Sequence, residues 1–497
     1  MSKPMGQKKI TVIGAGFAGL SAAAYLAQAG CEVNVYEKNE LIGGRARQFS
    51  TANGYVFDMG PSWYWMPGVF ESFFADFGCR TDDFYQLVQL DPQYAIIFGH
   101  QDVLKVPADP TEISTLFENT EKGAADALSA YLKEAAFKYK TGIDKLVYKP
   151  GISLLEFADP DLLQGIFRLQ VFTSLSKHVH KHFEHPHLRA LMEFPALFLG
   201  AMAEDTPALY SLMNYAGLAL GTWYPQGGFG KVVDAMKTVA MRAGARFQTG
   251  EAVSGFEIKH RRITKINTVK GSYEVDGVIG AADYHHIDQR LLEPKYRNYD
   301  EEYWESRVMA PSSLIFYIGV KKKIEKLLHH NLFFDEAMSL HAKEIYKAPR
   351  WPSKPLFYVC CPSKTDPTVA PIGHENIFIL MPLATGLEDN EALREKYFDT
   401  IMNRLEAYCG EEIRKFVDYK KSYCVADFTA DYNAFGGNAY GLANTLGQTA
   451  ILKPSIRNKK VDNLIFSGHL TVPGPGVPPS IISGKVAANQ ILKRLKN

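Results

Sequence analysis

The chain has 497 residues, 46% of them hydrophobic and 22% charged, so it is long enough for more than one domain around a large core. Its formal net charge of +1 provides no field for a polyanion, which argues against nucleic acid as a partner. No segment reaches the roughly 18 consecutive apolar residues of a membrane-spanning helix. With no apolar stretch before the first predicted strand, we expect a cytoplasmic protein. The six cysteines are scattered and contain no C-x-x-C pair, which favours buried thiols over a metal framework.

The segment Lys9–Arg47 predicts a nucleotide-binding βαβ unit. A buried strand over Ile10–Ile13 leads into a turn with G-x-G-x-x-G spacing. Its glycines are Gly14, Gly16 and Gly19. Such a turn lets the backbone approach a pyrophosphate at the start of a helix.

An acidic residue and a second glycine motif follow this unit. Glu37 closes the second strand, where a carboxylate accepts hydrogen bonds from ribose hydroxyls and repels the extra phosphate of NADP. Gly44, Arg45 and Arg47 come next, and they offer a permissive backbone and two guanidinium groups for phosphate and ribose.

The next segments combine aromatic and helical patterns. Seven aromatic residues between Trp63 and Phe77 predict either an ordinary core or part of a wall for a flat, apolar ligand. From Pro107 to about Leu220 the apolar spacing is helical, which indicates an inserted domain.

A histidine-rich segment lies inside that insertion. It contains His178, His180, His182, His185 and His187. We disfavour metal binding because Glu184 is the only nearby carboxylate and no cysteine is close. The basic neighbours Arg168, Lys177, Lys181 and Arg189 border the apolar run Ala190–Ala203. This combination suits a face that lies on an anionic bilayer, with a plain solvated helix as an equal alternative.

The remaining chain predicts further strands and two helices. A tight turn at Trp223–Gly228 precedes a helix over Lys231–Ala243. Strands are expected at 245–250, 251–258, 262–269, 273–281, 314–320, 356–360, 376–381 and 464–466. The prolines after Val477 open a terminal helix, whose dipole would point into the same site as the first helix.

Several motifs together resemble a known family. GAGFAGL and EKNELIGGRARQ resemble the FAD-binding entrance of the flavin amine oxidase and carotenoid desaturase superfamily. WYPQGG, HHNLFF, YGLANTLGQTA and SGHLTVPGPGVPPSIISGK resemble its bacterial carotenoid desaturase branch, the phytoene desaturases, and the resemblance spans nearly the whole chain.

The resemblance implies an α/β fold, in which an FAD-binding Rossmann-type (glutathione-reductase-like) domain carries an inserted mixed-sheet and helical substrate domain. The FAD-binding parts are expected at 1–105, 223–298 and 456–497. The helical, membrane-associating part is expected at 106–222 and the sheet part of the substrate domain at 299–455.

The resemblance also implies the cofactor contacts. Gly14, Gly16 and Gly19 would hold the pyrophosphate of FAD, Glu37 the adenosine ribose, and Gly44, Arg45 and Arg47 the phosphate and ribityl side. Gly60 would lie near the flavin ring, Val253 at the adenine, and Gly468 and Val477 at the terminal cofactor contacts. His469 stands where the superfamily often has an acid. No catalytic residue and no metal are predicted.

The implied reaction is desaturation of phytoene toward lycopene. Hydride leaves an allylic carbon for the flavin and a proton leaves the neighbouring carbon, which forms a conjugated double bond. The expected partners are a long polyene, peripheral membrane lipid, and oxygen or quinone as electron acceptor. Alternatives are a late carotenoid 3,4-desaturase, a saturase or isomerase, an amine oxidase and, least favoured, a non-catalytic lipid carrier. Polar residues at the closed end of a substrate tunnel would favour the late 3,4-desaturase.

Overall fold

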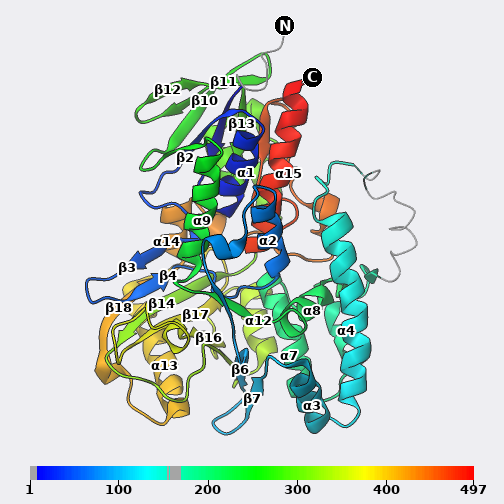
Figure 1. Cartoon of the computed structure of the whole chain (residues 1–497), viewed down its shortest axis with the longest axis vertical. Helices are drawn as coiled ribbons and strands as arrows, with labels where there is room; N and C mark the ends of the chain where they lie inside the picture. Colours follow the sequence, from blue (N-terminus) through cyan, green and yellow to red (C-terminus); the bar gives the residue numbers. More distant parts are fainter. Residues whose placement is uncertain (1–7, 154–155, 157–168, 497) are drawn as a thin grey trace.

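The computed structural model describes residues 8–153, 156 and 169–496, and two sheets form its frame (Figure 1). The first is a parallel sheet in the order β19-β13-β1-β2-β9. Its strands are β1 (Lys9–Ile13), β2 (Glu32–Tyr36), β9 (Arg246–Gln248), β13 (Gly277–Gly280) and β19 (Leu464–Phe466). They come from the beginning, middle and end of the chain, as the sequence predicted.

Three helices pack on or beside this sheet. They are α1 (Phe17–Gln28), α9 (Phe229–Arg242) and α15 (Val477–Lys496). Helices α1 and α15 approach so closely that a Cβ on Gly484 would lie 2.4 Å from the carbonyl oxygen of Ala18. The small residues of both helices therefore permit a tight contact that a larger side chain would prevent.

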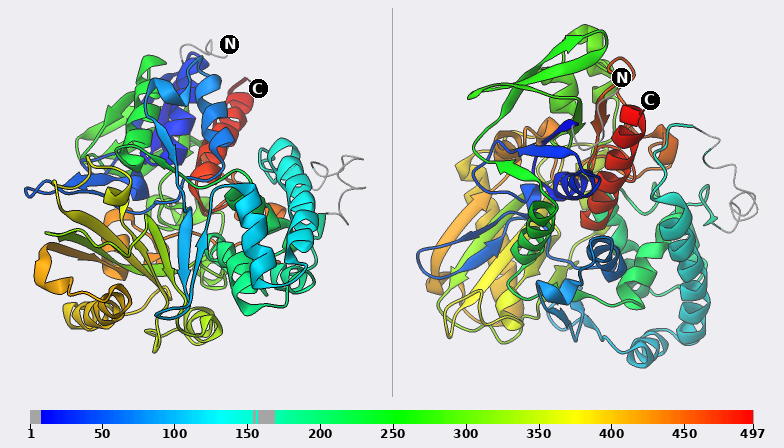
Figure 2. Two further views of the ribbon diagram at one scale, coloured as in Figure 1. Left: turned by 60° about the horizontal axis from the view of Figure 1, so that its bottom comes forward. Right: turned by 45° about the horizontal axis from the view of Figure 1, so that its top comes forward.

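A smaller antiparallel sheet extends this part of the molecule (Figure 2, right). It contains β10 (Val253–Lys259), β11 (Arg262–Thr268) and β12 (Gly271–Glu274). The predicted strand at 273–281 is divided in the structure, because β12 belongs to this sheet and β13 to the parallel one.

The second large sheet has seven strands in the order β18-β14-β17-β16-β15-β6-β7. They are β18 (Val417–Tyr423), β14 (Ser312–Val320), β17 (Glu375–Leu383), β16 (Phe357–Cys360), β15 (His330–Phe333), β6 (Tyr94–Ile97) and β7 (Val103–Val106). All neighbours are antiparallel except β15 and β6, so the sheet is mixed. Helix α13 (Glu391–Cys409) buries Phe398, Ile401 and Leu405 in one core with Phe316 and Ile318 of β14.

Most of the inserted helices lie beside the seven-stranded sheet (Figure 2, left). They are α3 (Pro110–Thr120), α4 (Ala124–Thr141), α6 (Leu175–His180), α7 (Pro186–Glu193) and α8 (Leu212–Leu218). The remaining named elements include α2 (Pro67–Ala75), α12 (Met338–Tyr346), α14 (Val425–Tyr432) and the pairs β3–β4 (Gln48–Ser50, Val56–Asp58) and β5–β8 (Leu87–Gln89, Trp223–Pro225). Within the described ranges, no helix is long and apolar enough to cross a membrane. The predicted α/β fold class, with its inserted mixed-sheet and helical part, is confirmed.

The apolar run Ala190–Ala203 lies inside the protein. Leu191, Met192, Phe194 and Ala196 are almost completely buried. The run therefore packs in the core and does not form the exposed bilayer-binding face considered from the sequence.

Only part of the histidine-rich segment comes together, since potential ligand atoms of His178, His182 and Glu134 lie within 4.8 Å of one another. His178 is buried against Tyr131, and its Nε2 lies 3.4 Å from the ammonium nitrogen of Lys138. His187 instead stacks on Phe98, with ring centroids 3.8 Å apart. A positive ammonium beside the buried imidazole disfavours a cation at that position. Of the predicted basic neighbours, Arg168 lies outside the described residues.

Candidate active site

One cavity of about 1080 Å³ connects the glycine turn after β1 with the seven-stranded sheet. Its wall includes Gly14 and Gly16 at one end, and Ile315, Leu332 and Leu380 from strands β14, β15 and β17. A cofactor on the turn and a substrate over the sheet would therefore share one cavity.

The predicted glycines have different roles at the turn after β1. Gly14 has a φ of +97°, a conformation that favours glycine. A Cβ on Gly19 would lie 1.9 Å from the Gly14 carbonyl oxygen, so Gly19 lets α1 pack against the turn. Of the predicted site residues, nine line the cavity: Gly14, Gly16, Glu37, Gly44, Arg45, Gly60, Val253, Gly468 and Val477. Gly19 and Arg47 are not among the lining residues.

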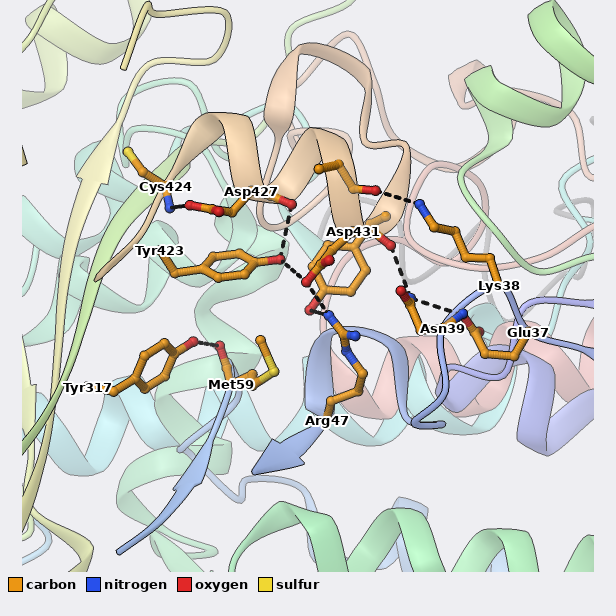
Figure 3. Close-up of polar contacts among 12 residues, drawn as sticks. Glu37, Lys38, Asn39, Arg47, Met59, Tyr317, Tyr423, Cys424, Asp427 and Asp431 are labelled. Carbon is orange, nitrogen blue, oxygen red and sulfur yellow. Dashed lines mark hydrogen bonds and ion pairs between the residues drawn. The ribbon is translucent and has the colours of Figure 1, made fainter. Parts of the chain in front are cut away.

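Glu37 is held by three N–H groups, and Figure 3 shows its contact with Asn39. Its Oε2 accepts a hydrogen bond from the backbone of Ala15 at 2.9 Å. Its Oε1 accepts from the backbone and the side-chain amide of Asn39, at 2.9 and 3.0 Å. The carboxylate keeps lone pairs for hydroxyl donors and faces the cavity, as a ribose acceptor requires.

Arg47 forms part of the support behind the cavity (Figure 3). It forms an ion pair with Asp431, and its guanidinium lies 5.1 Å from the ring centroid of Tyr432. Burial lowers the pKa of Arg47, but Tyr432 and Asp431 outweigh that effect and hold the pKa above its usual value. Asp431 also accepts from the Tyr423 hydroxyl at 2.8 Å. Arg47 therefore joins the second motif to α14, and its predicted contact with FAD remains a proposal.

Arg45 and His469 bring nitrogen atoms to the cavity. The Nε atom of Arg45 and the Nε2 atom of His469 are buried and have no hydrogen-bond partner among the described residues. Burial, and then the charge of Arg45, keep the pKa of His469 well below its usual value, so this imidazole is neutral. A buried guanidinium beside glycine backbone suits the negative pyrophosphate of a dinucleotide. The residues present therefore fit FAD.

Gly60 packs tightly where the cavity turns toward the seven-stranded sheet. A Cβ on this residue would lie 2.6 Å from the Arg45 carbonyl oxygen, so glycine is needed for the close contact. Gly60 lines the main cavity and also a smaller cavity of about 20 Å³ beside it.

The aromatic segment serves both of the roles considered from the sequence. Trp63 and Trp65 line the cavity, whereas Phe70, Phe73 and Phe74 are buried in the core. Further apolar wall residues are Phe194, Leu197, Leu199, Phe334, Ile345 and Leu356. A long, apolar molecule would bury its surface in favourable contacts with this wall.

The sequence analysis did not identify three polar side chains in the cavity wall, which are Ser62, Tyr346 and Tyr358. The hydroxyls of Ser62 and Tyr358 lie 2.9 Å apart. The hydroxyl of Tyr346 is buried and has no hydrogen-bond partner within the described part of the chain. Side chains alternate between the two faces of a strand, so the sequence could have assigned Tyr358 to one face of β16. That this face borders the cavity depends on the order of strands in the sheet, which the structure shows.

Comparisons with known proteins show which family the chain belongs to. The family model for flavin containing amine oxidoreductase matches residues 17–492. The chain is 41% identical over 487 residues to a carotenoid 3,4-desaturase of Haloarcula japonica, covering 97% of this chain and 98% of that protein. It is 29% identical over 500 residues to a zeta-carotene-forming phytoene desaturase of Myxococcus xanthus, covering 99% and 95%.

Solved structures share the fold at low sequence identity. Cyclohexylamine oxidase from Brevibacterium oxydans IH-35A has a TM-score of 0.60 at 15% identity and covers 99% of this chain and 100% of that one. A putative protoporphyrinogen oxidase from Exiguobacterium sp. 255-15 has a TM-score of 0.62 at 12% identity and covers 99% of each chain. The chain thus belongs to the flavin-containing amine oxidoreductase family, in its carotenoid desaturase branch, and is an FAD-dependent oxidoreductase.

Proposed function

We propose that this enzyme introduces the 3,4 double bond into an acyclic carotenoid that carries a hydroxyl on its end group. The observation that carries the proposal is the buried Tyr346 hydroxyl, which has no hydrogen-bond partner among the described residues and lies in the wall of a largely apolar cavity. An unpaired buried hydroxyl costs roughly 1–3 kcal/mol, and a hydroxylated end group would remove that cost. The 41% identity to a carotenoid 3,4-desaturase supports the same reaction.

The position of Tyr346 favours a polar group away from the cofactor. It lies at the end of α12, whose Ala342 and Ile345 line the apolar part of the cavity. Burial is the main reason that the pKa of this phenol is raised, so its hydroxyl remains protonated and can donate to a hydroxyl oxygen. A substrate fixed at this end would present one defined carbon pair to the cofactor.

The second candidate is the conversion of phytoene toward lycopene by repeated desaturation. The largely apolar wall favours it, because a hydrocarbon without polar ends could slide to several positions. The 29% identical relative, a phytoene desaturase, supports it too. In either case FAD, held by the glycine turn and Glu37, would supply the hydride acceptor, and oxygen or a quinone is the proposed final electron acceptor.

We also propose peripheral binding to a membrane, through an apolar rim formed by Ile152, Phe172, Leu446 and Leu452. Phe172 is 86% exposed and Leu452 is 52% exposed, although both also line the cavity. Gly151, next to Ile152, lies close to Ala450, so the two segments of the rim adjoin. A lipid surface is the occupant that suits this rim, since a carotenoid could then pass from bilayer to cavity without crossing water.

The test offers purified FAD-loaded protein three substrates in separate liposomes: phytoene, a hydroxylated acyclic carotenoid with a saturated 3,4 bond, and its analogue without the hydroxyl. We expect the absorption of the hydroxylated carotenoid to shift to longer wavelength, with slower change in the analogue and none in phytoene. Rapid coloration of phytoene while the hydroxylated carotenoid persists would instead establish the second candidate.

A further inference from the structure

A chain of three hydrogen-bonding groups leads from the cavity wall into the protein. The hydroxyls of Ser62 and Tyr358 lie 2.9 Å apart, and the Tyr358 hydroxyl lies 2.6 Å from Nδ1 of His330. Ser62 and Tyr358 line the cavity, whereas His330 is completely buried behind them. The imidazole at the inner end therefore does not border the cavity itself, and its hydrogen bond to the Tyr358 phenol connects it to the cavity wall.

The outer end of this chain lies beside the expected flavin position. Ser62 lies two residues after Gly60 in the sequence, and both residues line the cavity. Tyr358 on β16 pairs with Leu332 on β15 and with Leu380 on β17, and both of these leucines also line the cavity. The phenol thus faces the space in which a polyene would pass the reactive part of the cofactor.

His330 is neutral at rest and is a weak base, so it can accept a proton only from a strong acid. Burial, followed by the neighbouring His329, lowers the pKa of His330 well below its usual value, so the resting imidazole is neutral. The phenol of Tyr358 remains protonated, because burial raises its pKa well above the usual value. The proposed relay uses the tautomer of His330 whose Nδ1 carries no proton, so that the phenol donates to Nδ1 and the Ser62 hydroxyl donates to the phenol oxygen.

Burial and His329 oppose a positive charge on His330, and the contact with Trp63 offsets part of that cost. Its ring stacks on Trp63, with centroids 4.2 Å apart and planes inclined by 7°. An imidazolium over the face of an indole is stabilised by the ring quadrupole. Its Nε2 is buried and lacks a hydrogen-bond partner among the residues that the structure describes, which is uncommon for a group with only a structural role.

The reaction needs such an acceptor. Forming a double bond removes a hydride from one carbon and a proton from the next, and the positive charge that hydride loss creates makes the second C–H bond strongly acidic. A weak neutral base is therefore sufficient, provided that it lies beside the carbon.

We propose that Tyr358 takes this proton while its own phenolic proton passes to Nδ1 of His330, an inference that rests on the proposed carotenoid desaturation. The C–H bond breaks, its electron pair becomes the new double bond, and the hydride from the neighbouring carbon reduces FAD. Reoxidation by oxygen or a quinone consumes the hydride and one proton, so the proton held by His330 returns through the phenol and is used. Tyr358 is the catalytic residue, and Ser62 and His330 position it.

The neighbouring imidazole provides a matched control. His329 is buried next to His330, but its Nδ1 lies 2.8 Å from the Thr365 hydroxyl and it does not line the main cavity. Potential ligand atoms of His329, His330 and Cys360 also lie within 4.8 Å of one another, so a bound metal is the competing role for His330.

The experiment measures anaerobic reduction of FAD by carotenoid in the holoenzyme, in H2O and in D2O. Tyr358→Phe and His330→Asn should each slow reduction about 100-fold, and the double variant no further, because the two groups act as one unit. Wild type should show a solvent deuterium isotope effect that Tyr358→Phe lacks. His329→Asn should reduce FAD within a few fold of the wild-type rate.

Two further measurements separate this role from a structural one. FAD content and carotenoid affinity, followed by absorption, should be unchanged in Tyr358→Phe. Wild-type reduction speed in Tyr358→Phe, or an isotope effect that persists there, would overturn the proposal. Stoichiometric metal that is lost in His330→Asn would overturn it as well. If wild-type FAD is not reduced by any carotenoid, the proposed function itself fails.

Discussion

Oε2 of Glu37 accepts a hydrogen bond from the backbone N–H of Ala15 at 2.9 Å. This contact joins the end of β2 to the glycine turn after β1, so the acid shapes the turn in addition to facing the cavity. Substitution of Glu37 can test these two roles without changing the packing of the core.

Glu37→Gln should weaken FAD binding about tenfold or more, because an amide cannot accept from all three N–H groups and hydrogen bonds to a charged group contribute roughly 1.5–3 kcal/mol. The measurement is a fluorescence titration of apoprotein with FAD. Glu32→Gln, at an exposed position of the same strand, should bind like the wild type.

Gly16→Val and Gly19→Ala should fail in different ways. A Cβ on Gly16 would meet only the Gly44 Cα, at 3.8 Å, so the apoprotein should fold but lose FAD, since the side chain enters the pyrophosphate path. A Cβ on Gly19 would clash with the turn itself, so this variant should unfold at lower temperature even without FAD. Circular dichroism melting and flavin absorbance distinguish the two, and full flavin retention by Gly16→Val would refute the assigned turn.

Tyr346→Phe should remove the preference for a hydroxylated carotenoid. Losing one buried hydrogen bond corresponds to about 1 kcal/mol, or roughly a fivefold lower kcat/KM. Activity on the analogue without the hydroxyl serves as the internal control and should not fall. An equal loss on both substrates would assign Tyr346 to packing alone.

Lys453 should make stability depend on pH. Burial lowers the pKa of this ammonium from 10.5 to about 7, so between these values the unfolded chain binds a proton that the folded protein does not. The free energy of unfolding therefore rises with pH across this window, by at most about 1.4 kcal/mol per pH unit from this group. Lys453→Met should lack this increase in urea unfolding at pH 7 and pH 9, whereas the exposed Lys460→Met should match the wild type.

Phe172→Ser combined with Leu452→Ser should reduce sedimentation with liposomes, because both side chains expose apolar surface on the rim. Val269→Ser, an exposed apolar residue on another part of the molecule, should sediment like the wild type. Unchanged binding by the double variant would place the membrane contact elsewhere.

Local signals were sufficient for the cofactor end of the site. The spacing of Gly14, Gly16 and Glu37 depends on one strand, one turn and one helix, and the structure brings all three residues to the cavity. The strand at Leu464–Phe466 was also predicted correctly, because a short apolar run followed by glycine and proline is unambiguous.

The substrate end depended on contacts between distant segments. Strand β6 pairs with β15, so Asn331 lies opposite Ala95, and no local pattern specifies such a partner. The run Ala190–Ala203 was ambiguous for the same reason, since its apolar residues suit a core and a bilayer equally well. The HHNLFF motif was visible, but the bond between His330 and Tyr358 requires the register of β15 and β16.

The parallel sheet has a consequence for synthesis of the protein on the ribosome. β13 needs β19 as its outer neighbour, and α1 needs α15 to cover it, but both partners are translated after every other element of the fold. A growing chain therefore exposes the alanine-rich side of α1 until its last helix emerges, and general hydrophobic chaperones can bind there. Gly468 and Val477 also line the cavity, so the wall of the cofactor site is complete only after β19 and the start of α15 have been added.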